Sequence, residues 1–133
     1  MATTTATLTL TSADLTGDAL SLSSTATITK ADSATGLDQT TGVARKFFAS
    51  TQANTTLIAA ADYTAGKAHK VYIKNTSTSN SEFIKVEIGS SNTSIGFLYG
   101  GDFLFMPYDG ENDIDIDTSA VNMTVEFLVI YEA

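Results

Sequence analysis

The sequence of 133 residues contains no cysteine, no tryptophan, a single proline, Pro107, and a single histidine, His69. Without cysteine, the chain has no disulfide scaffold, no thiolate metal site and no cysteine nucleophile. No apolar run approaches the roughly 20 residues that a membrane-spanning helix needs. No window shows a long amphipathic helical pattern either. These absences exclude several classes of protein before any motif is considered.

Basic residues are also scarce, since seven Lys and Arg stand against 15 Asp and Glu, which gives a formal net charge of −8. The imbalance is concentrated in residues 68–133, which carry ten acids but only three lysines. Binding to nucleic-acid phosphates or to anionic membranes requires clustered positive charge. We therefore expect no nucleic acid and no membrane as a partner. The acids are typical of residues that keep a β-rich protein soluble; a basic or cation-coated partner is the alternative.

Apolar residues make up 43% of the chain, and many of them alternate with polar residues, above all threonine and serine. Successive residues of a strand point to opposite faces, so this alternation predicts antiparallel sheets with one apolar and one polar face. The runs lie at residues 5–11, 20–29, 70–74, 83–88 and 113–117. We predict a single all-β domain over residues 1–133, an antiparallel β-sandwich with little or no helix.

Two apolar segments near the C-terminus depart from simple alternation. Residues 121–131 have one apolar row throughout, whereas the other row changes from polar residues to Leu128 and Ile130. A strand that is apolar on both sides at its end is expected inside a layered structure or at an interface. In residues 95–106, the pair Gly100-Gly101 divides two apolar runs, which predicts a tight reversal between two largely buried strands.

The N-terminal segment is neutral and has strong β propensity. We expect residues 1–11 to act as an interaction arm or edge strand that pairs with a neighbouring sheet. Residues 30–42 are polar and indicate a loop, either an ordinary exposed one or a linker that follows an N-terminal hairpin. The expected interface residues are Thr5, Thr7, Leu8, Thr9 and Leu10 in the arm, with Leu128 and Ile130 in the last strand.

Few residues suit catalysis or metal binding. Asp113, Asp115 and Asp117 offer hard oxygen ligands for calcium, but their spacing fails as an EF-hand, and we favour the solvent-facing side of a strand. His69 is in register with the apolar row of its own strand, so its ring is expected to point inward and pack. No nucleophile-elbow, dinucleotide-binding or Walker pattern occurs. We predict no catalytic residue, no enzymatic activity and no cofactor.

Sugar binding without catalysis is an alternative interpretation. Tyr63, Tyr72, Tyr99 and Tyr108 are suited to stack on pyranose rings, and we expect Tyr72 on the polar face of its strand and Tyr108 at a loop. Exposed tyrosines are equally typical of protein interfaces. The sequence therefore leaves a carbohydrate-binding module open beside a protein-binding one.

Several motifs follow one another in a characteristic order. Residues 71–76 read Val-Tyr-Ile-Lys-Asn-Thr, and residues 82–88 read Glu-Phe-Ile-Lys-Val-Glu-Ile. Gly-Gly-Asp at residues 100–102 precedes an apolar strand, and the chain closes with Asp-Ile-Asp-Ile at 113–116 and a strand at 125–132. In this order the elements resemble small virion proteins of tailed bacteriophages, especially phages of marine bacteria. The start, rich in threonine and alanine, is similar to phage surface proteins.

The resemblance implies a jelly-roll-like sandwich that binds the phage particle without enzymatic activity, as a capsid decoration (cement) protein on the outside of the head. A tail, neck or fibre accessory protein is the alternative. The resemblance also implies the major capsid protein or other virion proteins as partners. It implies a homo-oligomer, for which a trimer suits threefold capsid axes, and the virion, assembled in the host cytoplasm, as the location.

Overall fold

The computed structural model describes residues 3–15 and 17–133, and the chain divides into two compact units, Met1–Asp38 and Gln39–Ala133. In the described residues, the regular structure is almost entirely β-strand and every strand pairing is antiparallel. The predicted all-β fold is therefore confirmed. The single domain expected over residues 1–133 stays a prediction. Met1 and Ala2, the first residues of the expected arm, lie outside the described residues.

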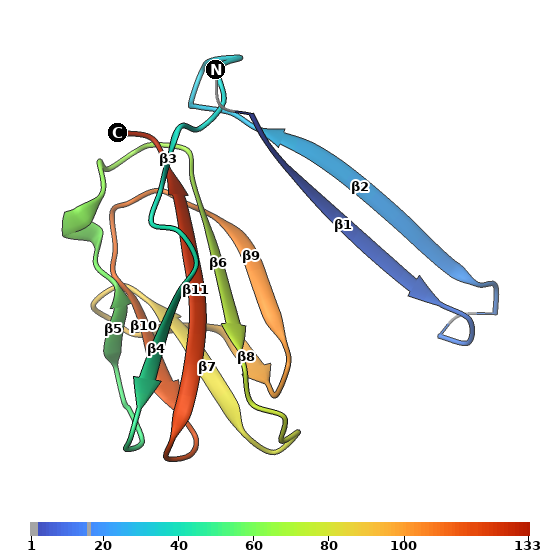
Figure 1. Cartoon of the computed structure of the whole chain (residues 1–133), viewed down its shortest axis with the longest axis vertical. Coiled ribbons are helices and arrows are strands. Elements are labelled where there is room, and N and C mark those ends of the chain that lie inside the picture. The colour runs from blue at the N-terminus through green and yellow to red at the C-terminus, as the bar shows by residue number, and fades with distance from the viewer. Residues whose placement is uncertain (1–2, 16) are drawn as a thin grey trace. The chain divides into compact units, whose positions relative to one another are not determined.

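The first unit is built on a hairpin of two long strands, β1 (Thr4–Ser12) and β2 (Leu20–Ile28), which form a sheet of their own (Figure 1). Nine consecutive residue pairs join the strands without a bulge. The segment predicted as an arm is therefore mostly the first strand of a hairpin that continues to Ile28.

The polar residues after β2 fold into a closed loop. The backbone N–H of Lys30 donates to the carbonyl oxygen of Thr35 over 2.8 Å, and the Lys30 ammonium pairs with the Asp38 carboxylate, also at 2.8 Å. The N–H of Leu37 returns to the carbonyl of Ile28, the last residue of β2. Most of the segment predicted as a loop thus belongs to the first unit and has its own hydrogen bonds.

The second unit is a β-sandwich of two antiparallel sheets (Figure 1). In the first, which we call the β6 sheet, β11 pairs with both β3 and β4 on one side and with β6 on the other, and β9 forms the opposite edge. Its strands are β3 (Gln39–Thr40), β4 (Ala44–Phe48), β6 (His69–Asn75), β9 (Phe103–Tyr108) and β11 (Met123–Tyr131).

The second sheet, which we call the β7 sheet, has the strand order β5-β10-β7-β8. Its strands are β5 (Thr55–Ile58), β10 (Ile114–Thr118), β7 (Phe83–Ile88) and β8 (Thr93–Tyr99). Helical structure in the described residues is limited to one 3-10 turn, Ala60–Asp62. No helix in this part of the chain has the length and apolar character needed to span a membrane.

The hydrophobic core lies between the inward faces of the two sheets. Every second residue of the central strands is shielded from solvent, as the period-two pattern predicted. Fully buried members are Val71, Ile73, Val125 and Val129 from the β6 sheet and Ile84, Val86, Ile114 and Ile116 from the β7 sheet. His69 is in the same inward row and is also fully buried, which confirms its expected orientation. The narrower expectation of jelly-roll connectivity stays a prediction.

The pair Gly100-Gly101 joins strands that belong to different sheets. Strand β8 pairs with β7, and β9 pairs with β6, so this turn crosses from one layer to the other. The expectation that both strands are largely buried is wrong, because Phe97 and Phe103 are about half exposed on their outward faces. Each strand lies at an edge of its sheet, and only one of its faces meets the core.

Candidate functional site: exposed apolar surfaces

One face of the hairpin is mostly aliphatic, and we call it the leucine face: Ala6, Leu8, Leu10, Leu20, Leu22 and Ala26, with Ser24 opposite Leu8 and Ser12 opposite Leu20. Residues directly opposite each other in the ladder share a face, so the register that pairs Leu10 with Leu22 also pairs Ala6 with Ala26. Leu8 and Leu10 are each 47% exposed and Leu22 is 45% exposed. An aliphatic surface of this kind, turned to solvent over most of two strands, is typical of a contact site.

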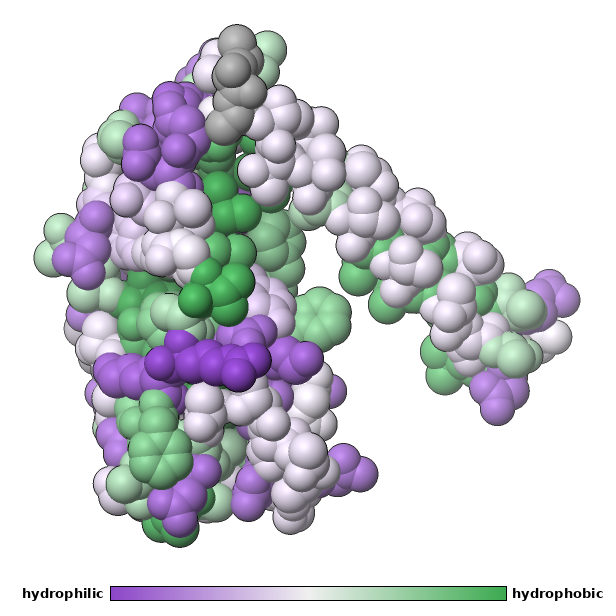
Figure 2. Space-filling model, viewed as in Figure 1, coloured by the Kyte–Doolittle hydropathy of each residue, from purple (hydrophilic) through white to green (hydrophobic). Residues whose placement is uncertain are grey.

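The opposite face of the hairpin carries hydroxyl groups alone, and we call it the hydroxyl face: Thr5, Thr7, Thr9, Thr11, Ser21, Ser23, Thr25 and Thr27. Thr7 and Thr25 share a hydrogen bond of 2.8 Å across the ladder. Figure 2 shows the division, with hydrophobic residues along one side of the hairpin and nearly neutral colour along the other. The five arm residues predicted as an interface therefore fall on two faces, with Leu8 and Leu10 on one and the threonines on the other.

The outward side of the β6 sheet carries a second apolar surface, which we call the aromatic face: Tyr72, Phe103, Phe105 and Leu128. Tyr72 in β6 is directly opposite Phe105 in β9 and Leu128 in β11, so these three side chains form one row across three strands. The rings of Tyr72 and Phe103 are 6.2 Å apart. Leu128, predicted as an interface residue, thus lies in this row, and Ile130 lies next to it on the same outward side of β11.

The aromatic face is bordered by positive charge. Arg45, Lys70 and Lys74 point outward from β4 and β6, and Glu126 is the acid among them. Arg45 Nε donates to Glu126 Oε2 over 2.8 Å, and this bond lowers the pKa of the Glu126 carboxyl. The Tyr72 hydroxyl donates to the other carboxylate oxygen, and partial burial together with that carboxylate raises the pKa of Tyr72. This side of a protein of net charge −8 is thus locally basic.

A third apolar patch, the β8 patch, lies on the outward side of the β7 sheet: Phe83, Ile95, Phe97 and Tyr99. The ring of Phe83 contacts those of Phe97 and Tyr99 edge-on, with centroids 5.1 and 5.7 Å apart. The charged side chains on this side of the sheet are mostly acidic: Glu87 and Asp115, which are buried, and Asp117, which pairs with the single lysine, Lys85. The two outward faces of the sandwich therefore differ in local charge although both carry exposed phenylalanine.

The calcium candidates Asp113, Asp115 and Asp117 have separate roles. Asp113 Oδ1 accepts the N–H of Ala60, and Asp117 Oδ1 accepts the N–H of Asn54, each over 2.7 Å. Asp115 is buried, which corrects the expectation that all three line a solvent-facing side. In residues 3–15 and 17–133, no group of three or more His, Asp or Glu side chains is placed to hold a metal ion.

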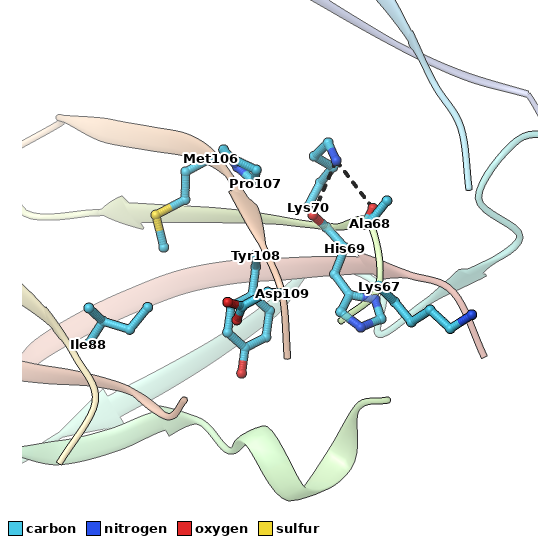
Figure 3. A pocket seen from close by; sticks show the side chains of 9 residues that line it. All are labelled: Lys67, Ala68, His69, Lys70, Ile88, Met106, Pro107, Tyr108 and Asp109. Atoms are coloured by element: carbon cyan, nitrogen blue, oxygen red, sulfur yellow. Dashed lines mark hydrogen bonds between the residues drawn. The ribbon is translucent and has the colours of Figure 1, made fainter. Parts of the chain in front are cut away.

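A shallow hollow of about 430 Å³ opens at the end of β6 and β9, beside His69 (Figure 3). His69 Nε2 donates to the carbonyl of Thr64 over 2.9 Å, and Nδ1 accepts the N–H of Glu132 over 3.2 Å, so both ring nitrogens are occupied by backbone. Lys70 Nζ turns back to the carbonyl oxygens of Ala68 and His69. The polar groups around this hollow thus stabilise the fold around it.

The tyrosines considered for sugar binding differ in accessibility. Tyr108 is the last residue of β9, next to the loop expected there, and it is 4% exposed with its hydroxyl donating to the carbonyl of Asn112. Tyr63 packs edge-on against Tyr108 and Tyr131. Tyr72 is on the polar side of β6, as expected, and Tyr99 is the most exposed of the four. These side chains do not form one stacking platform.

Comparisons with protein-family models, curated proteins and solved structures return no match to this chain. The chain's own surfaces are therefore the structural evidence that bears on its function. The residues predicted as an interface include Leu8, Leu10 and Leu128 of these exposed surfaces, and that prediction did not include Phe103 and Phe105. The alternation of these two phenylalanines with Leu104 and Met106 was the available signal, since it predicts that one row of β9 points away from the core.

Proposed function

We propose that this protein is a non-enzymatic structural component of a tailed-phage particle, acting as a decoration protein bound to the outside of the head. The leucine face of the hairpin is the observation that carries the proposal. A two-stranded hairpin is at best marginally stable alone in water, and an uncovered aliphatic face adds to its need for a partner. A particle surface with a matching apolar groove or sheet edge would supply one.

The physical properties of the chain support this role. The net charge of −8 keeps the protein soluble before assembly, while the strands of the hairpin carry no charged side chain that would have to be desolvated on docking. Both long edges of the hairpin also have free backbone groups, so either strand can extend a neighbouring sheet. The major capsid protein is the partner that the resemblance in residues 70–132 suggests.

Co-sedimentation with purified capsids tests the proposal. The sequence alone suggests deleting residues 2–11, but that deletion would leave β2 without its partner strand. Deleting residues 2–28 removes the complete hairpin and leaves the sandwich strands untouched. We expect the full chain to sediment with capsids and the deleted chain to remain in the supernatant with an unchanged β-rich circular dichroism spectrum of the body.

Point variants in the same co-sedimentation experiment test which face of the hairpin binds the capsid. Leu10→Thr keeps strand propensity but removes an exposed leucine from the leucine face, whereas Thr9→Ser changes the hydroxyl face by one methyl group. We expect the first to weaken capsid binding and the second to leave it intact. Binding by isolated tails with none by heads would favour the tail or neck alternative. Equal capsid binding by the full and hairpin-deleted chains would contradict the proposal.

A further inference from the structure

Among the described residues, each unit exposes apolar surface: the hairpin has the leucine face, and the sandwich has the aromatic face of the β6 sheet and the β8 patch. We propose that the hairpin of one copy docks its leucine face on the aromatic face of a second copy, and that the second hairpin returns the contact in a two-fold dimer. This inference goes beyond the proposed function and concerns the protein without any particle; because the dimer covers both leucine faces, it would have to open before a hairpin docks on a capsid.

The charges select the aromatic face over the β8 patch. The strands of the hairpin are uncharged, and its connecting segment carries Asp14 and Asp18. Arg45, Lys70 and Lys74 around the aromatic face outnumber Glu126 and attract those acids, whereas the single lysine beside the β8 patch, Lys85, is already paired with Glu87 and Asp117. Opposite potentials favour one partner surface and like potentials disfavour the other.

The size of the contact favours reciprocal exchange. A ribbon of two nine-residue strands covers an area of about 30 Å by about 10 Å, so one docked hairpin removes roughly 600 Å² of total surface. This is well below the approximately 1,200 Å² that a specific, stable interface needs, and two identical contacts related by a two-fold axis reach it. Packing leucine face against leucine face would also bury only about 600 Å² and would leave both aromatic faces exposed.

The two surfaces that meet in the dimer are both apolar. Leu8, Leu10 and Leu22 would pack against Tyr72, Phe105 and Leu128, so aliphatic and aromatic groups meet and no ionised group is buried. The Tyr72 hydroxyl keeps its hydrogen bond to Glu126 at the border of the patch. The hydroxyl face remains turned to water, which suits an arm that is covered on one side only.

Analytical ultracentrifugation of the full chain tests the inference. We expect a concentration-dependent species of twice the 14.0 kDa chain mass. Phe105→Thr and Leu10→Thr each remove a large apolar side chain from one of the two surfaces, and each should raise the dimer Kd about thirtyfold or more. Phe97→Thr, at a phenylalanine of the β8 patch that is similarly exposed, and Thr9→Ser, on the hydroxyl face, are the matched controls and should leave the Kd unchanged.

Mixing the two disruptive variants distinguishes exchange from other arrangements. The Phe105→Thr chain keeps an intact hairpin, and the Leu10→Thr chain keeps an intact aromatic face, so one contact of the pair survives in the mixture. We expect the mixture to form more dimer than either variant alone at the same total concentration. A full chain that is monomeric at every concentration would overturn the inference, as would a dimer that Phe105→Thr leaves intact or that Phe97→Thr weakens equally.

Discussion

Glu87 in β7 and Asp115 in β10 lie directly opposite each other in the antiparallel ladder, and both are buried. One carboxylate oxygen of each, Glu87 Oε2 and Asp115 Oδ1, is buried without a hydrogen-bond partner among the described residues. Lys85 pairs with the other oxygen of Glu87 and with Asp117. Like charges opposite each other in a sheet are destabilising, and buried unpaired oxygens add a desolvation cost.

We predict that Asp115→Asn stabilises the protein by about 1 kcal/mol, because it removes one of the two like charges and supplies an amide donor for Glu87. Chemical denaturation at neutral pH measures the change. Asp117→Asn is the control and should destabilise, since it weakens the bonds from Asp117 to the Asn54 N–H and to Lys85. A lower free energy of unfolding in Asp115→Asn would contradict the interpretation.

His69 should contribute to stability through the two backbone groups that it bridges. His69→Ala would leave the Thr64 carbonyl and the Glu132 N–H without their side-chain partner and would open a cavity among Tyr63, Tyr108 and Tyr131. We expect a loss of about 3 kcal/mol or more in the free energy of unfolding. His69→Gln retains a donor and an acceptor and should lose clearly less. An equal loss in both variants would show that packing alone accounts for the effect.

Tyr108 should make the fold sensitive to alkaline pH. Burial, with the negative charges of Asp113 and Asp109 beside it, raises the pKa of Tyr108 to about 12. An unfolded chain releases the same proton at about pH 10. Between these values the folded state binds more protons than the unfolded state, so the free energy of unfolding is unaffected below pH 10 and falls as pH rises from 10 towards 12.

Two measurements check the behaviour of Tyr108. Absorbance titration at the phenolate band should show one tyrosine ionising near pH 12, and Tyr108→Phe should lack that step. Denaturation curves at increasing pH should show a smaller alkaline decline in the free energy of unfolding for Tyr108→Phe than for the parent protein. The lysines titrate in both proteins, so their contribution cancels in this comparison. Identical declines in both proteins would be inconsistent with the raised pKa.

The two glycines between β8 and β9 should differ in their tolerance of alanine. A Cβ added at Gly100 would overlap the backbone carbonyl of Ser79, whereas at Gly101 the added atom would meet open space but the backbone has φ +87°. We expect Gly100→Ala to lower the free energy of unfolding by about 2–3 kcal/mol. Gly101→Ala should lower it by about 1 kcal/mol, the cost of left-handed backbone for a side chain. Thermal unfolding of both variants measures the order, and the reverse order would contradict the packing argument.

The alternation of residue types already fixed which side of each strand is apolar. Val71 and Ile73 were predictable as core residues, and Leu8 and Leu10 as one face of a ribbon, because a strand turns successive side chains to opposite sides whatever it pairs with. The same alternation places His69 on the inward side of β6. These properties are local, since they follow from the pleat of a single strand and need no knowledge of its neighbours.

The partners of each strand could not be obtained in this way. Pairing in β-sheets joins residues far apart in the chain, so nothing near Gly100 reveals that the turn connects two different sheets rather than closing a hairpin. Asp115 has the sequence pattern of an exposed residue, and it is buried because β10 lies between β5 and β7 in the assembled sheet. The row of Tyr72, Phe105 and Leu128 likewise exists only because β9, β6 and β11 are neighbours. Local alternation set the polarity of each face, and long-range pairing decided which faces became core and which became surface.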